Sequence, residues 1–449
     1  MTRLSSIRLL IVGLTVLALA AVFRIPGASS NVFQFRHVDR DQNHYSQFSN
    51  SLPSDPSYFP IGVRFQQVVS QADIDLDKNA GLNLYVVLTA NSDLSLIQRN
   101  GLRVILQQSE WRKNPIAVKS PAVAGWELFD EIDMQQGPGR GYATLSNIVA
   151  EIPKDGRMRY NNYDVIFWET TAQAARFVNE FQHVVSNDTY SFTDPHLSDS
   201  EVIPWLNNGN PLTTTQINRA ANHGYTVDRM RALDTMDGVR RPIWNVIEVG
   251  WPYTETAAQC GRAIEPAEVS AAVWHSIIAG ARGIIYFNHS FNGPNPSHHV
   301  LRDPAYAAVR AVVRSTNQLI TQLAPVLNAT FADGFATADP SVRTMTKFHQ
   351  DKCFVFAGSK ENKASTPTPS LAGFGSGTAT IIAKDRTIPI SNGRFSDGFG
   401  DGNAIHISGL LASNSRPWYI TMLWITDMCS PALVPGHPAG RDGLPGGMR

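Results

Sequence analysis

Val123-Ala-Gly-Trp-Glu-Leu-Phe-Asp-Glu-Ile-Asp133 is a short apolar run that ends in three acids. This pattern is typical of a buried strand that delivers carboxylates to the segment after it. A second run of the same kind, Pro242-Ile-Trp-Asn-Val-Ile-Glu-Val-Gly-Trp251, reaches Glu248. Because burying a lone carboxylate is costly, acids at the ends of apolar strands usually have a partner or a chemical task. We therefore expect Glu131 and Glu248 to belong to one site.

Apolar runs of this length recur through the chain, with helix-like stretches between most of them. Eight candidate strands cover residues 58–65, 82–88, 102–106, 123–129, 165–168, 183–185, 243–247 and 283–287. The helical patterns cover residues 67–78, 92–99, 145–152, 170–181, 216–233 and 265–281, and a last one, residues 306–323, ends before Pro325. Strands that alternate with helices form parallel βαβ units, and eight of them predict a closed (β/α)₈ TIM barrel in the α/β class.

The pattern changes after about residue 331. Short strands without intervening helices are expected at residues 342–348, 353–357, 377–383, 387–390 and 404–407, separated by turns rich in Gly, Pro, Ser and Asn. This arrangement predicts a small antiparallel β-sandwich. The chain thus divides into a catalytic barrel, residues 58–330, a β-sandwich, residues 331–411, and a tail of uncertain structure, residues 412–449.

The N-terminus has the pattern of a secretory signal peptide, which we assign to residues 1–30. Arg3 and Arg8 precede an uncharged apolar run, residues 9–23, and small residues follow it. The run is shorter than the roughly 20 residues that span a bilayer comfortably. We expect a secreted, extracellular protein with a polar linker at residues 31–57; an uncleaved N-terminal membrane anchor is the alternative.

Composition argues against several classes of protein. The chain has 449 residues, 43% of them apolar, with 38 basic and 38 acidic side chains and no basic block, so we expect no nucleic-acid partner.

Cys260, Cys353 and Cys429 are too few for a disulfide framework, and their pairing stays open. No metal-binding His motif and no nucleophile elbow occur, so we expect neither metal nor cofactor. A glycine-rich stretch, residues 137–141, lacks the lysine of a phosphate loop and predicts a mobile loop at the rim.

Residues at the carboxyl ends of barrel strands line the mouth where ligands bind. Glu131 follows the fourth predicted strand and Glu248 ends the seventh. Two carboxylates that face each other across a mouth suit glycoside hydrolysis, in which one protonates the leaving oxygen and the other attacks the sugar or activates water. The structural alternative is that arginines at the rim hold both glutamates in salt bridges.

With these two glutamates and a C-terminal β-sandwich, residues 58–410 resemble the retaining (β/α)₈ glycoside hydrolases of clan A. The resemblance implies that Glu131 is the acid/base and Glu248 the nucleophile. Members of the clan usually have Asn before the acid/base glutamate, to bind the sugar 2-hydroxyl. This chain has Asp130, which accepts the proton of that hydroxyl and has no amide hydrogen to donate.

Other strand ends supply candidates for binding the substrate. Flat aromatic faces suit sugar rings, and the aromatic candidates are Trp168, Tyr190 and Trp251, together with Trp111. The candidates for binding hydroxyls are Asp130, Asn187, Asp188, Asn288 and His289, although Asn and Asp at such positions also cap turns. Arg64 either holds a catalytic carboxylate in its required state or pairs with an acid at the rim. Trp126 is expected to pack in the core, and Asp133 to cap a turn or helix.

The two proposed roles need opposite protonation states at one pH. Glu131 lies between Asp130 and Asp133, whose negative charges would raise its pKa and keep its proton. Glu248 has no acid within four residues on either side and would stay ionised if Arg64 or Tyr190 reached it. This asymmetry predicts Glu131 as the acid, Glu248 as the nucleophile and a separation of about 5–5.5 Å, as in retaining enzymes.

The sequence therefore predicts a secreted glycoside hydrolase that cleaves O-glycosidic bonds of a poly- or oligosaccharide with retention of configuration. The alternative is a catalytically inactive carbohydrate-binding or surface-adhesion protein that keeps the barrel as a scaffold. Fold alone does not separate the two.

Overall fold

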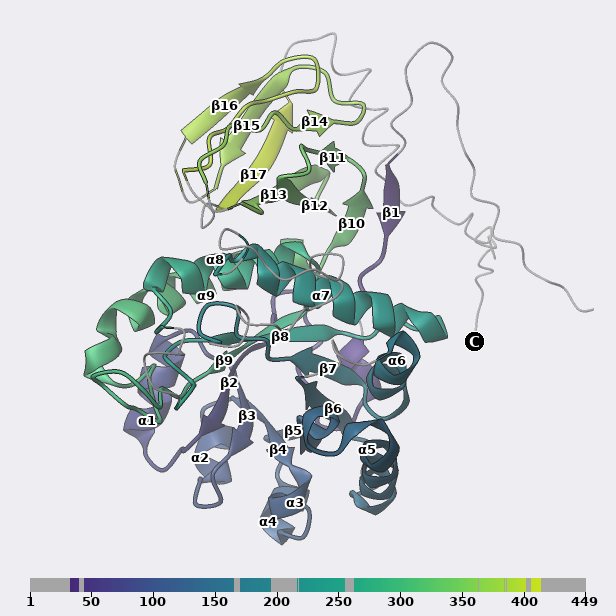
Figure 1. Ribbon diagram of the computed structural model, residues 1–449, viewed down its shortest axis with the longest axis vertical. Helices are drawn as coiled ribbons and strands as arrows, with labels where there is room; N and C mark the ends of the chain where they lie inside the picture. Colours follow the sequence, from purple (N-terminus) through teal and green to yellow (C-terminus); the bar gives the residue numbers. More distant parts are fainter. Residues whose placement is uncertain are drawn as a thin grey trace, which may run out of the picture.

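The computed structural model describes residues 33–39, 44–164, 170–194, 216, 218–254, 262–361, 363–382, 384, 386–400 and 405–412. The predicted signal peptide, the tail after residue 412, Trp168, Cys260 and Cys429 lie outside these residues. Figure 1 shows two parts, a barrel surrounded by helices and a β-domain beside it. Within the described part of the chain, no helix combines the length and apolar character needed to cross a membrane.

Eight parallel strands close into a barrel, as predicted. They are β2 (Ile61–Gln66), β3 (Leu84–Leu88), β4 (Arg103–Gln107), β5 (Val123–Asp130), β6 (Met158–Tyr163), β7 (Val184–Asn187), β8 (Ile243–Glu248) and β9 (Gly283–Phe287). The barrel closes where β2 pairs in parallel with β9, from Ile61 opposite Ile284 to Arg64 opposite Phe287. The carboxyl ends of all eight strands therefore meet at one mouth.

Helices form the outer layer of the barrel (Figure 1). They are α1 (Gln71–Asn79), α2 (Leu94–Arg99), α3 (Gln108–Trp111), α4 (Pro115–Lys119), α5 (Ile132–Glu151), α6 (Thr171–Glu180), α7 (Ala221–Asp234), α8 (Pro266–Ile278) and α9 (Ala307–Leu327). Local sequence signals start several of them. A capping box of Ser70 and Asp73 begins α1, and Pro266 occupies the first turn of α8.

The fifth barrel strand differs from the prediction. It is β6, Met158–Tyr163, whereas the apolar run at residues 165–168 suggested a strand several residues later. The pattern failed because β6 carries two adjacent asparagines that are wholly buried, Asn161 and Asn162. Their amides are satisfied inside the protein: Asn161 Oδ1 accepts a bond from Phe129 N at 2.9 Å, and Asn162 Nδ2 donates to Asp130 Oδ1 at 3.1 Å. A strand that binds its neighbours through side chains loses the apolar signature.

Two further expectations about helices were wrong. Residues 137–141 are part of α5, where Gly137 (φ 64°, ψ −179°) makes a kink between two helical segments in place of the expected rim loop. Pro325 lies inside α9, which continues to Leu327. A proline in the last turn removes only its own N–H donor, and Asn328 N still binds Ala324 O at 2.9 Å, so the helix is completed beyond it.

Part of the predicted linker, residues 31–57, is built into both domains. β1 (Gln34–Arg36) pairs with β10 (Thr330–Asp333) of the β-domain, as Figure 1 shows. The short 3₁₀ helix at His44–Gln47 and the chain after it pack against the barrel interior at the start of the strands, where Trp244 Nε1 donates to Tyr45 OH at 3.1 Å. The segment therefore closes the end of the barrel opposite the mouth.

The C-terminal domain is the antiparallel β-sandwich that the sequence predicted. Its larger sheet has the order β1-β10-β12-β13-β17-β15-β16, with β12 (Val342–His349), β13 (Lys352–Ser359), β15 (Gly377–Ile381), β16 (Arg386–Ile390) and β17 (Ile405–Ala412). A two-stranded sheet of β11 (Ala336–Thr337) and β14 (Ser370–Leu371) covers a core that includes Phe335, Cys353, Val355, Leu371 and Phe395. The domain contacts the barrel through α8, where Trp274 stacks on Phe356 at 6.2 Å.

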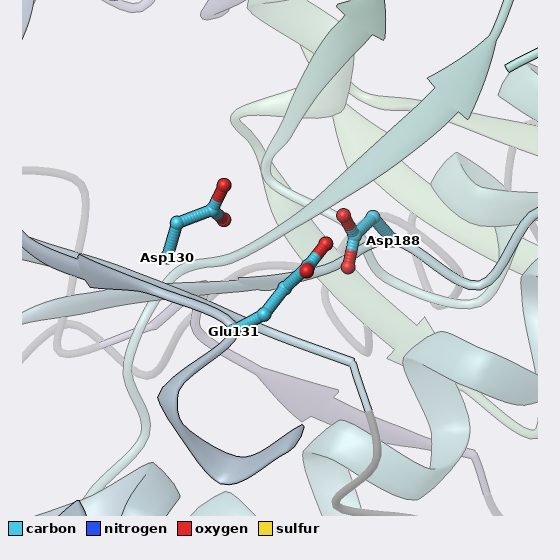
Figure 2. A group of neighbouring side chains, drawn as sticks. All are labelled: Asp130, Glu131 and Asp188. Carbon is cyan, nitrogen blue, oxygen red and sulfur yellow. The ribbon is translucent and has the colours of Figure 1, made fainter. Parts of the chain in front are cut away.

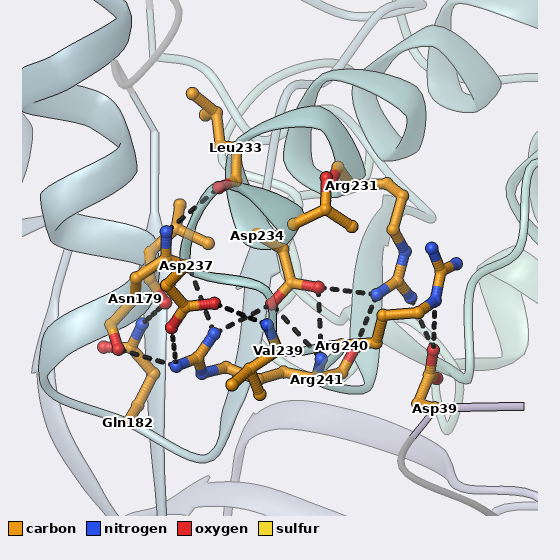
Figure 3. Close-up of polar contacts among 12 residues, drawn as sticks. Asp39, Asn179, Gln182, Arg231, Leu233, Asp234, Asp237, Val239, Arg240 and Arg241 are labelled. Atoms are coloured by element: carbon orange, nitrogen blue, oxygen red, sulfur yellow. Dashed lines mark hydrogen bonds and ion pairs between the residues drawn. The ribbon is translucent and has the colours of Figure 1, made fainter. Parts of the chain in front are cut away.

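A buried ion-pair network joins α7 to the start of β8 (Figure 3). Asp234, wholly buried, accepts bonds from Arg231 Nη1 at 2.6 Å and from Arg241 Nη1 at 3.2 Å. Arg241 also binds Asn179 O of α6 at 2.8 Å, and Arg231 reaches Asp39 at 2.9 Å. One carboxylate thus organises two arginines that connect the helix layer, a barrel strand and the N-terminal segment.

We predict that Asp234→Ala destabilises the fold by about 3–5 kcal/mol, because it removes the buried carboxylate that Arg231 and Arg241 share. The control is Asp228→Ala on the same helix. Its carboxylate binds Arg343 at 2.6 Å but is 46% exposed, so about 0–1 kcal/mol is expected. Urea unfolding of both variants measures the difference, and equal losses would contradict the assigned role of Asp234.

Candidate active site

Acids from neighbouring strands gather at the barrel mouth. Asp130 ends β5 and Glu131 follows it, Asp164 follows β6, and Asp188 follows β7. Oxygens of Asp130, Glu131 and Asp188 lie within 4.8 Å of one another. Figure 2 shows Glu131 and Asp188 reaching toward each other, with Asp130 beside them. The stretch that predicted a catalytic acid therefore delivers it into a cluster of carboxyl groups.

Glu131 is held in an uncommon backbone conformation. It is the N-cap of α5 with φ 50° and ψ 42°, in the left-handed region that non-glycine residues seldom adopt. No loop separates β5 from α5, so this residue alone turns the chain from strand to helix. Its backbone is held at both ends: Glu131 N binds Asn162 O at 3.2 Å and Gln135 N binds Glu131 O at 3.0 Å. Strain of about 1–3 kcal/mol at such a position is typical of functional sites.

Glu131 and Asp188 form a pair that retains a proton. Their side chains share a hydrogen bond, and burial, followed by neighbouring carboxylates, raises the pKa of both groups. Asp188 is only 4% exposed, and its pKa lies well above the ordinary range. Tyr190 OH donates to Asp188 Oδ2 at 3.4 Å, while Oδ1 has no hydrogen-bond partner within the described residues. The pair therefore holds its proton to a higher pH than ordinary carboxyl groups do.

Arg64 lies wholly buried in the barrel beside this pair. Its Nη2 is 2.7 Å from Glu127 Oε1 and 2.5 Å from Asp130 Oδ1, so it pairs with a rim acid, the second of the two roles that the sequence allowed. Asn162 Nδ2 also donates to Asp130 at 3.1 Å. With two donors on its carboxylate, Asp130 is fixed between β2, β5 and β6, and its position next to Glu131 is set by contacts rather than by a flexible loop.

A layer of polar side chains continues from Asn162 toward β7. Ser186 Oγ donates to Asn162 Oδ1 at 2.6 Å, and Tyr160 OH lies 2.5 Å from Ser186 Oγ. All three residues are fully buried. These bonds link the carboxyl ends of β6 and β7, the strands that deliver Asp164 and Asp188, so the acids rest on a connected support.

Glu248 ends β8 and is completely buried. Its Oε1 accepts a bond from Phe192 N at 2.9 Å, and its Oε2 lies 3.4 Å from His223 Nε2 of α7. Burial raises the pKa of Glu248 to about 8 and lowers the pKa of His223 to about 3. At neutral pH both groups are therefore uncharged in this conformation.

The expectation that Glu248 is ionised by its surroundings was wrong. The sequence argument counted acids nearby along the chain, but desolvation is the larger effect. The two groups expected to reach Glu248 have other partners in the described structure: Arg64 binds Glu127 and Asp130, and Tyr190 binds Asp188.

Tyr253, in the segment after β8, links the two parts of the mouth. Burial and then the charges of nearby acids raise its pKa well above the ordinary value, and these acids include Asp188 and Glu248. Its ring centroid is 6.3 Å from that of Tyr190. The structure thus brings both predicted glutamates to the same end of the barrel, while the direct partner of Glu131 is Asp188.

The asparagine candidates have structural contacts. Asn187 Nδ2 donates to Tyr163 O at 2.7 Å, and Asn288 Oδ1 accepts from Leu301 N at 2.8 Å; both asparagines are fully buried. Their contacts match the alternative in which such residues fix turns. Neither side chain belongs to the binding site proposed below.

The aromatic candidates separate into two groups. Trp111 and Trp126 lie in the core, the second as expected. Tyr190 is 8% exposed and binds Asp188, while Trp251 is half-buried against the segment after β9. Among the aromatic candidates that the structure describes, Tyr190 and Trp251 are therefore the two placed to meet a ligand at the mouth.

Asp133 lies in the first turn of α5, as expected, and accepts a bond from Asp164 N at 3.3 Å. Burial raises its pKa to about 7.

Sequence reasoning gave too little weight to Asp188 and missed Asp164. The signal for Asp188 was present, because Val184-Val-Ser-Asn-Asp188 ends an apolar strand on an acid just as residues 123–131 do. Asp164 was overlooked because the fifth strand was placed after it, whereas β6 ends directly before it.

The cluster of Asp130, Glu131 and Asp188 is close enough for three oxygens to meet one cation. However, Asp130 is already paired with Arg64, and Glu131 and Asp188 share a hydrogen bond. These groups satisfy one another, and we assign no metal to them.

Comparisons with known proteins give matches among solved structures. No family model and no curated protein matches the chain. A structure titled glycoside hydrolase has 11% identity and a TM-score of 0.49, covering 80% of this chain and 93% of that one. A family 5 glycoside hydrolase from Bacteroides vulgatus ATCC 8482 has 11% identity, a TM-score of 0.47 and coverages of 80% and 90%. A family 30 endoxylanase from Clostridium papyrosolvens C71 has 10% identity, a TM-score of 0.42 and coverages of 79% and 96%.

We predict that Glu248→Gln stabilises the protein in a pH-dependent way. The ordinary pKa of glutamate is 4.5, and burial raises it to about 8 in the folded state. As pH rises from about 4.5 to 8, the unfolded chain releases this proton first, so the wild type loses stability relative to the variant; above about pH 8 the difference levels off.

Melting temperatures of both proteins between about pH 5 and 9 measure the effect of Glu248→Gln. Glu180→Gln on α6, whose carboxylate is 49% exposed, controls for the loss of one surface charge. A difference between wild type and Glu248→Gln that does not change with pH would contradict the assigned proton.

Proposed function

We propose that this protein is a glycoside hydrolase whose active site is the barrel mouth. The observation that carries the proposal is the Glu131–Asp188 pair, which retains a proton at the end of the fourth barrel strand, with a second carboxyl group, Glu248, at the end of the seventh. Glycoside hydrolysis requires a carboxylic acid that protonates the leaving oxygen and a second carboxyl group that acts on the anomeric carbon. The mouth supplies both on rigid strand ends.

In the proposed first step, Glu131 gives its proton to the glycosidic oxygen as the bond between that oxygen and the anomeric carbon breaks. The electron pair of the bond goes to the leaving oxygen. The hydrogen bond from Asp188 then stabilises the carboxylate that is left on Glu131. Glu248, once ionised, attacks the anomeric carbon and forms a glycosyl ester. Water, deprotonated by Glu131, later hydrolyses this ester with overall retention of configuration.

Charge at the mouth favours neutral over acidic glycans. Asp130, Glu131, Asp164 and Asp188 lie together, and the buried arginine among them, Arg64, is already paired. A sugar carboxylate would find no unpaired cation among these acids in the described part of the mouth, so we propose a neutral poly- or oligosaccharide as substrate. We also propose that the protein is secreted, on the basis of the apolar run at residues 9–23 and the small residues after it.

The second candidate is a carbohydrate-binding protein without catalysis. One observation favours it: Glu248 is completely buried and uncharged near neutral pH, whereas a nucleophile must be ionised and reachable. Aryl glycosides and neutral polysaccharides, assayed for hydrolysis and for binding in parallel, separate the candidates. Binding without turnover, unaffected by replacement of Glu131 or Glu248, would favour this second candidate.

We predict that Glu248→Gly abolishes turnover and that azide rescues it, with a glycosyl azide of inverted configuration. Glu131→Ala should lose activity mainly on substrates with poor leaving groups, by a factor of about 10²–10⁴, because these need the proton most. Product analysis by NMR and rates on aryl glycosides of graded leaving-group pKa provide the measurements. A first product of inverted configuration from the wild type would make Glu248 a general base instead.

Asp188 provides the matched comparison for these variants. In the proposed scheme, Asp188→Gly slows proton delivery but is not rescued by azide. If azide rescues Asp188→Gly, while Glu248→Gly keeps wild-type turnover, Asp188 is the nucleophile and the role of Glu248 is structural.

A further inference from the structure

The segment after β9, residues 288–303, which we call the rim loop, continues the mouth outward as a row of aromatic rings. The row begins at Tyr190, which binds Asp188, and the centroid of its ring is 5.3 Å from that of Phe287. Phe287 is followed by His289 at 5.2 Å, and His289 by Phe291 at 5.5 Å. The rings thus lead from the acid pair to the surface.

The outer end of this row is open to solvent. Phe291 is 37% exposed, and the exposed His298 lies beside it, with ring centroids 5.9 Å apart. His289, which contacts both rings, has its pKa lowered to about 4 by burial, so it is neutral at neutral pH. The outer row therefore offers flat, largely apolar faces next to the acidic cluster.

Backbone contacts hold the rim loop in a fixed position. Ser290 and Ser297 exchange two backbone hydrogen bonds of 2.8 Å, and Phe291 N donates to Trp251 O at 2.8 Å. The loop packs closely on the segment after β8, since a Cβ added at Gly250 would lie 2.7 Å from Ser290 Cβ. An exposed aromatic ring on a rigid support loses little conformational entropy when it meets a ligand.

We propose that Phe291 and His298 form a subsite that binds a sugar unit of the substrate away from the bond that is cleaved. This inference rests on the proposed function and extends it. The apolar face of a sugar ring stacks on aromatic rings, and the row of rings is continuous with the mouth. The occupant is therefore a further unit of the same glycan chain, and longer oligosaccharides gain affinity that disaccharides lack.

The test compares Phe291→Ala with Phe291→Leu, which keeps apolar volume but lacks a flat ring, and with Phe291→Trp, which enlarges the ring. Met236→Ala, at an exposed apolar side chain near the opposite end of the barrel, is the control.

The substrates are the disaccharide and the hexasaccharide of the xylo-, cello-, manno- and malto- series. For Phe291→Ala and Phe291→Leu, the hexasaccharide-to-disaccharide ratio of kcat/KM should fall roughly three- to tenfold, mainly through KM. Phe291→Trp and Met236→Ala should keep the wild-type ratio.

Outcomes for the subsite and for the proposed function are distinct. Turnover with an unchanged ratio in Phe291→Ala would overturn the subsite alone. If the wild type binds the hexasaccharides without cleaving them, the proposed hydrolase is rejected, and a weaker dissociation constant in Phe291→Ala still supports the subsite. A wild type that neither binds nor cleaves any member of the panel would overturn both.

Discussion

The structure of the mouth depends on the buried charge of Arg64. Burial alone would lower the pKa of this guanidinium, but the charges of Asp130 and Glu127 raise it well above the ordinary value. An unpaired cation inside the barrel would cost several kcal/mol, so both acids are needed where they stand. Because Arg64 belongs to β2 and both acids to β5, the pair ties two strands together across the barrel interior. It thereby fixes the end of β5, from which Glu131 projects.

The same pairing determines where protons remain. Burial raises the pKa of Glu127 to about 7, although the charge of Arg64 lowers it. Asp164 and Asp188 lack such a counterweight, since burial and neighbouring carboxylates all raise their pKa. In a poorly solvated mouth, protonation is the least costly way to relieve this repulsion. Because Arg64 is bound to Glu127 and Asp130, its charge does not pair with Glu131 or Asp188. The protonation of that acid pair therefore depends on the packing beneath it.

The sequence predicted the parts of this arrangement that depend on local pattern. Apolar runs identified the barrel, and an acid after such a run identified Glu131. The position of β6 was predicted wrongly because Asn161 and Asn162 are polar although they are buried. Their hydrogen-bond partners lie on the neighbouring strand β5, which the sequence pattern does not reveal. The protonation of Glu248 was not predictable either. It depends on burial and on Phe192, which is 56 residues away in the chain. The sequence pattern places a side chain at the end of a strand, but contacts with residues far away in the chain determine its protonation state.

In the reaction that we propose, the burial that favours the protonated acid pair disfavours an ionised nucleophile at Glu248, and both groups lie at one mouth. The transition state of glycoside hydrolysis resolves this conflict, because positive charge develops on the sugar ring. A cationic ring beside Glu248 favours its ionised form, so its pKa falls at the moment when the reaction needs a carboxylate. The low polarity around Glu248 then strengthens its attraction to the ring, and burial, unfavourable for the free carboxylate, contributes to stabilising the transition state.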